Sequence, residues 1–73
     1  MLEYEVKRRI VTLSENQKTQ WTKELNYISW YGAPPKYDIR DWSPDHQKLS
    51  RRGVTLTDQE MNKIKEMILC GII

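Results

Sequence analysis

Hydrophobic and polar residues alternate along most of the chain, and this period of two predicts β-strands rather than helices. Residues 6–14 are rich in β-branched side chains and predict a first strand, with a bulge or a late start near Arg9 to repair its imperfect alternation. Residues 20–31 predict a long second strand that carries apolar or aromatic side chains on both faces. After a Gly-Ala-Pro-Pro turn, residues 36–42 predict a third strand.

The pattern changes in the last third of the chain. Residues 43–45 (Ser-Pro-Asp) resemble the start of a one-turn helix, and a polar loop is predicted from there to Arg52. Residues 53–56 predict a short fourth strand. The sequence Thr57-Asp-Gln-Glu60 is a capping box, and apolar residues at helical spacing continue from it to Leu69. The segment from the capping box at Thr57 to Leu69 is therefore predicted to be a helix.

The predicted fold is α+β: a curved four-stranded antiparallel sheet followed by one C-terminal helix, in a single domain over residues 1–73. A chain this short buries a modest part of its surface. The single cysteine, Cys70, cannot form an internal disulfide, and with the lone His46 it cannot complete a zinc site. No metal or cofactor is therefore expected, and association is the remaining source of stability. The helix offers an apolar stripe through which two copies would pair as a homodimer: Met61, Ile64, Met67 and Ile68.

Charge is unevenly distributed along the chain. The net charge is only +2, but cations gather around Lys7 and again around Arg51, with aromatic residues between them. Cations and flat rings on one surface suit the binding of an unpaired polynucleotide. No apolar stretch is long enough to span a membrane, and the acidic N-terminus lacks the features of a signal peptide. A cytoplasmic location, soluble or on a bacterial nucleoid, is expected.

Residues that could support catalysis are sparse. His46 lies in a polar loop without an evident nucleophile beside it, so we expect it to be exposed and inert. Asp38 and Asp41 fall on opposite faces of a strand and cannot act as a pair. We therefore expect a protein that is not an enzyme.

Two motifs carry a resemblance to a known family. Asp38-Ile-Arg-Asp-Trp42, and then Arg52-Gly-Val-Thr-Leu-Thr57 with the helix after it, resemble the transcriptional positive cofactor family of single-stranded-DNA-binding coactivators. The resemblance covers residues 20–69, and the segment from Trp21 to Trp30 is similar to the bacterial YdbC-like branch. It implies a homodimer, paired through its helices, whose curved sheets form channels for single-stranded or melted DNA without sequence preference.

The resemblance also implies roles for individual residues. Arg40 matches a strand arginine that contacts DNA. The alternative is a structural role, in which Arg40 forms a cross-strand ion pair with Glu24. Trp30 matches an aromatic residue that stacks on bases. Each of the three tryptophans, Trp42 included, is as readily core as ligand-facing. The full set of expected nucleic-acid contacts is Lys7, Arg9, Lys18, Trp21, Lys23, Trp30, Lys36, Arg40, Arg51 and Arg52.

Two functional hypotheses follow. The first is sequence-independent binding of single-stranded DNA by a homodimer, in transcription or its regulation, or in replication or repair, with RNA as an alternative ligand. The second is a protein–protein interaction module in a transcription complex that does not touch nucleic acid, since aromatic residues and arginine are also enriched at protein interfaces.

Overall fold

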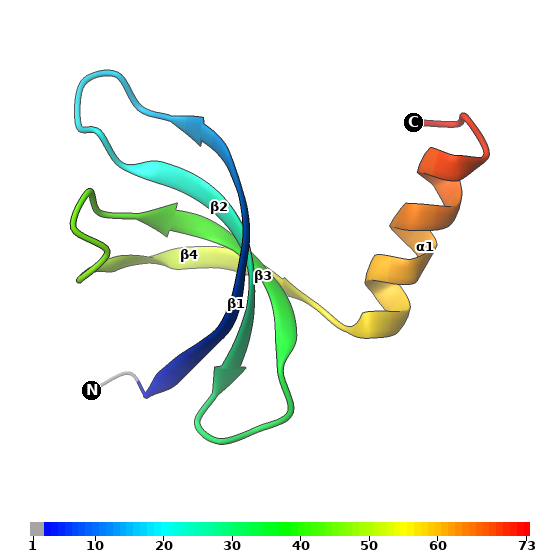
Figure 1. The fold of residues 1–73 in the computed structure, drawn as a ribbon, viewed down its shortest axis with the longest axis horizontal. Helices are drawn as coiled ribbons and strands as arrows, with labels where there is room; N and C mark the ends of the chain where they lie inside the picture. The colour runs from blue at the N-terminus through cyan, green and yellow to red at the C-terminus, as the bar shows by residue number, and fades with distance from the viewer. Residues whose placement is uncertain (1–2) are drawn as a thin grey trace.

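A computed structural model of the protein describes residues 3–73, and it has one antiparallel sheet and one helix (Figure 1). The strands lie in the order β1-β2-β3-β4, so each strand pairs with its neighbour in the sequence. This arrangement confirms the predicted α+β class and the predicted order of strands and helix. The elements are β1 (Tyr4–Glu15), β2 (Thr22–Trp30), β3 (Lys36–Trp42), β4 (Leu49–Leu56) and α1 (Asp58–Leu69).

The first two strands differ from their predicted lengths. β1 is longer at both ends, and its pairing with β2 skips Lys7, Ile10 and Leu13, so the strand has three irregularities where one was predicted. Such bulges increase the local twist of a strand, and they let β1 follow the strong curvature of the sheet. β2 is shorter than predicted because the backbone turns left-handed on both sides of it, at Gln20 (φ 64°) and Tyr31 (φ 51°).

The segment between β3 and β4 was predicted wrongly. Residues 43–45 form a turn rather than the start of a helix, because side chains take the backbone hydrogen bonds. The Ser43 hydroxyl donates to Asp45 (2.7 Å) and accepts from the Lys48 N–H (3.0 Å). Bonds from the Gln47 N–H and from Ser43 lower the pKa of Asp45. The predicted loop is also too long: β4 begins at Leu49, which pairs with the end of β3.

The helix follows the prediction closely. The Thr57 hydroxyl accepts from the Glu60 N–H (3.1 Å), and the Glu60 carboxylate accepts from the Thr57 N–H (2.8 Å), which completes the capping box. At the other end Gly71 adopts φ 75°, a conformation that glycine accepts without strain. The N–H groups of Gly71 and Ile72 then bond back to carbonyls of the last turn, at 3.1 and 2.9 Å.

The core of the sheet lies on one face, which we call the inner face. It carries Asn26, Ile28, Asp38 and Trp42, each with at most 1% of its surface exposed. The opposite outer face carries alternate residues of the same strands, and these are half-buried: Leu25, Tyr27, Tyr37 and Ile39. The inner face is therefore filled by the domain's own side chains, several of them polar.

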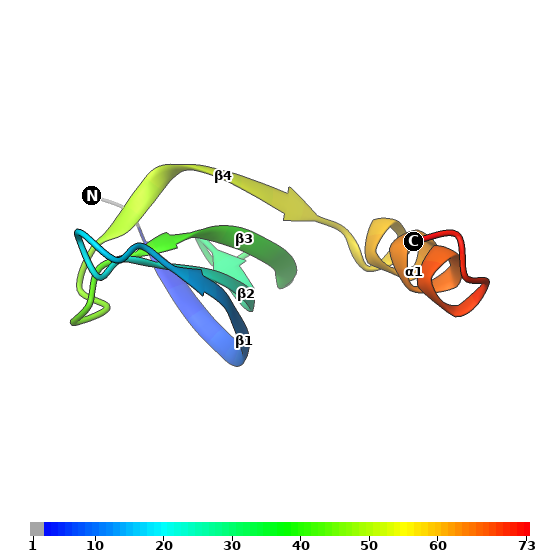
Figure 2. The ribbon, with the colours of Figure 1, turned by 90° about the horizontal axis from the view of Figure 1, so that it is seen from above.

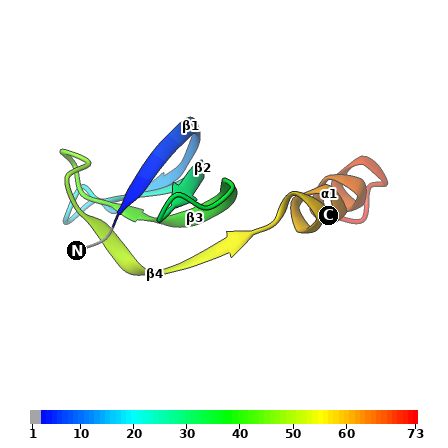
Figure 3. The ribbon, with the colours of Figure 1, turned by 90° about the horizontal axis from the view of Figure 1, so that it is seen from below.

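The helix stands to one side of the sheet rather than across it (Figures 2 and 3). Its first turns touch the outer face: the Tyr27 hydroxyl donates to Asp58 (3.1 Å), which raises the pKa of Tyr27, and the Lys65 ammonium lies 5.8 Å from the centre of the Tyr37 ring. Met61 is buried there. No helix within residues 3–73 is both long and apolar enough to cross a membrane.

The apolar stripe predicted for dimerisation is mostly open. Met61 packs within the chain, Met67 is half-buried, and Ile64 and Ile68 are 37% and 54% exposed. Most of this stripe is therefore not used by the chain's own sheet.

Candidate nucleic-acid interface

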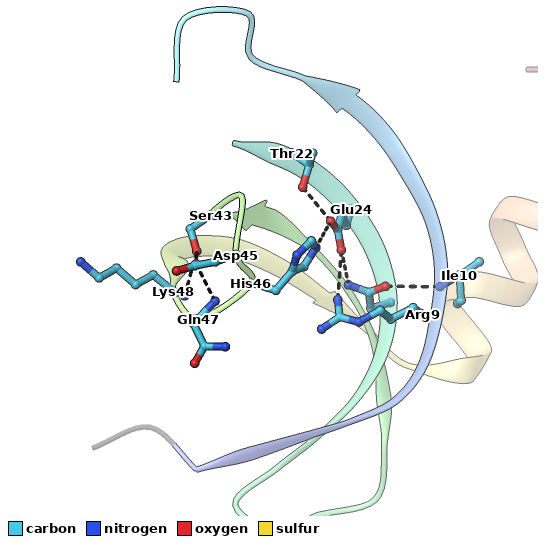
Figure 4. A network of polar contacts seen from close by, with 10 residues as sticks. Arg9, Ile10, Thr22, Glu24, Ser43, Asp45, His46, Gln47 and Lys48 are labelled. Carbon is cyan, nitrogen blue, oxygen red and sulfur yellow. Dashed lines mark hydrogen bonds and ion pairs between the residues drawn. The ribbon is translucent and has the colours of Figure 1, made fainter. Parts of the chain in front are cut away.

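A buried carboxylate organises the inner face (Figure 4). Glu24, 4% exposed, accepts hydrogen bonds from Thr22 (2.6 Å), Asn26 (3.2 Å) and Arg9 (3.3 Å), and it bonds the His46 ring at 2.7 Å. Burial raises the pKa of Glu24, but these bonds, with Thr22 and His46 foremost, bring it below its ordinary value. Glu24 is thus an ionised group that holds strands and turn together.

His46 belongs to this network, so the expectation that it is exposed and inert was wrong. Its ring lies 6.0 Å from the Trp42 ring and bonds Glu24 from the β3–β4 turn, which closes that turn over the inner face. The sequence gives no sign of this contact, because Glu24 and His46 are far apart in the chain and meet only through the curvature of the sheet.

Arg40 lies in a second buried ion pair. Its guanidinium donates two hydrogen bonds to Asp38, at 2.6 and 2.7 Å, and a third to the carbonyl of Ser50 at 3.0 Å. Asp38 is fully buried, and the Arg40 side chain is 10% exposed. Glu24 stands opposite Arg40 in the register, yet Asp38 is the ion-pair partner. In this structure Arg40 ties β3 to β4.

Gly53 makes room for this arginine. It pairs with Arg40 across the two strands, and a Cβ atom added to it would lie 2.8 Å from the Arg40 Cβ and 2.9 Å from its Cζ. Side chains do not approach so closely without a shift. The glycine of the Arg-Arg-Gly-Val sequence therefore lets the guanidinium lie against β4.

The aromatic residues of the inner face form one cluster. The Tyr4 ring lies 5.5 Å from the Trp30 ring and 5.8 Å from the Trp42 ring, centre to centre. The guanidinium of Arg9 lies 5.1 Å above Trp42, and that of Arg40 lies 4.6 Å above Trp30. Trp42 is completely buried, so it is core. Trp30 is half-buried, and part of its surface is already covered by Tyr4 and Arg40.

The cations predicted to contact nucleic acid fall into two groups. Lys7 pairs with Glu5 (2.9 Å), Arg9 with Glu24 (3.3 Å), and Arg40 with Asp38. The other five are exposed and form no ion pair with any residue in the described range 3–73: Lys18, Lys23, Lys36, Arg51 and Arg52. The charge of this second group is free to meet phosphates.

A cleft of about 490 Å³ opens between the β1–β2 turn and the start of β4. We call it the turn-end cleft, since the β1–β2 turn and the β3–β4 turn lie at the same end of the sheet (Figure 1). It brings together two of the predicted residues, the half-buried Trp21 and the exposed Lys23. The cleft is lined by Ser14, Glu15, Asn16, Thr19, Trp21, Lys23, Asp41 and Ser50.

The residues predicted to contact nucleic acid do not all lie in one region of the surface. Lys18 lies on the turn beside the cleft, and Arg51 follows Ser50 of its wall. Trp30 and Lys36 instead lie at the other end of the sheet, next to the β2–β3 turn. Sequence reasoning missed Ser50 as a wall of the cleft because the start of β4 was predicted to be a loop. Among residues 3–73, no three His, Cys, Asp or Glu side chains are grouped so that they could hold a metal ion.

The fold and the surface define a class of small α+β domain in which exposed cations flank an aromatic ring at one end of a curved sheet. Comparison with known proteins gives the family. Residues 17–67 match the model of the family described as Transcriptional Coactivator p15 (PC4), and the chain belongs to that family. This confirms the resemblance seen in the two motifs; placement in a bacterial branch stays a prediction. β1 lies wholly outside the matched residues.

The chain is also similar to an uncharacterized protein of Treponema pallidum (strain Nichols). The two are 48% identical over 65 residues, which cover 89% of this chain and 74% of that protein. The similarity therefore extends beyond the family match and takes in most of the sheet and the helix.

Proposed function

We propose that the protein binds single-stranded DNA as a homodimer, without a requirement for sequence, and serves transcription or its regulation, or replication or repair, in the cytoplasm. The PC4 family is one of nucleic-acid-binding proteins that are not enzymes, and we propose no catalysis here. The observation that carries the proposal is the group of five exposed cations that form no ion pair with residues 3–73, several of which flank the turn-end cleft with its half-buried Trp21.

The proposed binding has two physical components. Lys18, Lys23, Arg51 and Arg52 meet backbone phosphates, which releases counterions and needs no particular base. The ring of Trp21 stacks on a base, which contributes about 1–3 kcal/mol and also tolerates any base. Neither component reads the sugar, so RNA remains an alternative ligand.

The remaining predicted residues take supporting parts in this proposal. Arg9 and Arg40, with Trp30, hold the inner face in shape through the contacts described above. Lys36 extends the basic surface toward the β2–β3 turn, and Lys7 contributes charge from β1 once its pair with Glu5 gives way.

Exposed apolar surface supports the homodimer. Ile64 and Ile68 on α1 and Val11 and Val54 on the sheet are each 37–54% exposed. Removing apolar surface from water contributes about 25 cal/mol for each Å² buried. A second copy that packs on the stripe and against Val11 and Val54 would bury these side chains, and we propose that the dimer forms in this way, with the turn-end cleft left open.

The test is fluorescence anisotropy with a labelled 20-nucleotide oligo-dT and a duplex of the same length, each at 50 and 200 mM salt. If one protomer engages five phosphates, the logarithm of the affinity falls with a slope of about −3.5 against the logarithm of salt concentration. Single-strand affinity should then drop roughly 100-fold over this range. An affinity that does not change with salt would refute the proposal.

The end of the helix supports a second candidate function, a protein-interaction module. Leu69, Ile72 and Ile73 are 87%, 71% and 76% exposed, and Leu69 lies off the proposed dimer stripe. Absence of oligonucleotide binding at 50 mM salt, together with a stable fold, would favour this candidate.

A further inference from the structure

The turn-end cleft contains a carboxylate that no described residue uses. Asp41 is half-buried in the wall of the cleft, and within residues 3–73 its side chain makes no hydrogen bond and no ion pair. Lys23 stands opposite it in the register but is not within ion-pair distance. The Asp41 N–H donates to the Ser50 hydroxyl at 3.1 Å, which fixes the position of this residue in the strand.

Asn16 presents a complementary group in the lining of the same cleft. Its side-chain oxygen accepts from the N–H groups of Lys18 (2.9 Å) and Thr19 (3.0 Å), so the amide is held in place by the turn. The amide nitrogen has no hydrogen-bond partner in residues 3–73, and its two N–H donors are available at the cleft. The cleft thus presents a carboxylate with both oxygens unused by residues 3–73, an amide donor held by the turn, and an indole ring.

Among the four bases these groups match guanine most fully, because only guanine has two adjacent donors that engage both oxygens of a carboxylate. Guanine carries two adjacent donors, N1–H and the N2 amino group, and the O6 acceptor beside them. A carboxylate accepts two parallel hydrogen bonds of this kind, and an amide N–H completes the edge at O6. Thymine offers one N–H between two carbonyls, so the carboxylate would face an acceptor. The volume of about 490 Å³ lies within the usual range of ligand sites, roughly 300–1,000 Å³.

We propose that the turn-end cleft is a guanine subsite, in which Trp21 stacks on the base, Asp41 accepts from N1–H and the N2 amino group, and Asn16 donates to O6. The inference rests on the proposed function, because the guanine arrives as part of a single strand. Binding to the strand as a whole does not require sequence, and one position along it favours guanine. Lys23 lies beside the carboxylate and offsets its repulsion of the phosphates.

The experiment compares three versions of a labelled 20-nucleotide strand in the anisotropy assay. One is all thymine, one has a single central guanine, and one has hypoxanthine at that position, which keeps N1–H and O6 but lacks the N2 amino group. The guanine strand should bind about tenfold more tightly than the thymine strand, with the hypoxanthine strand between them. Asp41→Asn should abolish the preference, and Glu66→Gln, an exposed change on α1, should keep it.

Each result has a defined meaning. If the thymine and guanine strands bind equally, the subsite is refuted while the proposed function stands. If no strand binds, both fail. If Asp41→Asn keeps the preference, the assignment to Asp41 is wrong. The comparison of guanine with hypoxanthine uses the unaltered protein, so it decides the question even if a variant fails to fold.

Discussion

The ion pair between Asp38 and Arg40 allows a sharp test of how the inner face is held together. Two short bonds join the groups, and a third runs from Arg40 to the carbonyl of Ser50. Asp38→Asn keeps the size of the side chain but replaces one acceptor oxygen with a donor and removes the charge. The guanidinium would then be left largely buried and uncompensated, since Glu24, opposite it, is already bonded on both oxygens.

The expected loss is large relative to the total stability. Removing one partner of a buried ion pair costs about 3–5 kcal/mol. A chain of this length has a free energy of unfolding of roughly 4–11 kcal/mol at 0.05–0.15 kcal/mol per residue. Asp38→Asn should therefore remove about a quarter of the stability or more, and at the lower end of the stability range it leaves the domain unfolded at room temperature. Arg40→Lys should also destabilise, because an ammonium cannot make the two parallel bonds.

The assay is urea unfolding at pH 7, followed by circular dichroism, with all proteins at one fixed concentration because association shifts apparent stability. The matched control is Asp41→Asn, three positions along the same strand on the outer face, which should change the free energy of unfolding by less than about 0.5 kcal/mol. A loss under about 1 kcal/mol for Asp38→Asn would show that this ion pair within β3 does not hold the inner face together.

Four further changes test other parts of the structure. Ile68→Glu on the apolar stripe should give a monomer of unchanged helix content by analytical ultracentrifugation, whereas Lys63→Glu, also exposed on α1, should leave the mass as it is. Glu24 has a lowered pKa in the folded state, so its contribution to stability is present above its unfolded pKa and is lost as the pH falls through its folded pKa. Glu24→Gln should therefore flatten the decline of the free energy of unfolding toward acid pH, measured by urea unfolding between pH 3 and 7. An unchanged decline would assign this pH dependence to other groups. Trp21→Ala should weaken single-strand binding by about 1–3 kcal/mol without moving the urea midpoint, and full retention of affinity would remove that ring from the site. Gly53→Ala should cost about 1–3 kcal/mol in unfolding because its Cβ meets the arginine opposite it, and a neutral result would contradict that contact.

The elements that could be predicted are those defined by local chemistry. β3 has the predicted bounds because a proline turn precedes it and alternation runs through it, and α1 begins where the capping box places it. β4 was predicted too short because the polar residues Ser50, Arg51 and Arg52 near its start carry no alternation. They are strand because Leu49 and Ser50 meet the end of β3, a contact between segments that no local pattern records.

The site was harder to predict because the roles of its residues depend on which partner each side chain reaches. Arg9 and Arg51 look alike in the sequence, but only Arg9 lies within reach of a buried carboxylate. Arg40 was expected to meet phosphate or the acid opposite it, and it reaches Asp38 instead because Gly53 leaves space on that side. Such choices follow from the curvature of the sheet, which bulges in β1 reinforce.

The curvature of the sheet determines which aromatic ring is accessible to stack on a base. Within residues 3–73 the helix touches only the outer face, so the rings and cations of the sheet itself cover the inner face, and Trp42 and Trp30 belong to that cluster. Trp21 lies beyond the start of β2, outside the cluster, with exposed cations beside it. Trp30→Ala should therefore lower the free energy of unfolding more than Trp21→Ala, and Trp21→Ala should lower single-strand affinity more at equal folded fraction. The reverse order in both measurements would place the ligand on the inner face, where it would have to displace Tyr4 or Arg40 from the ring.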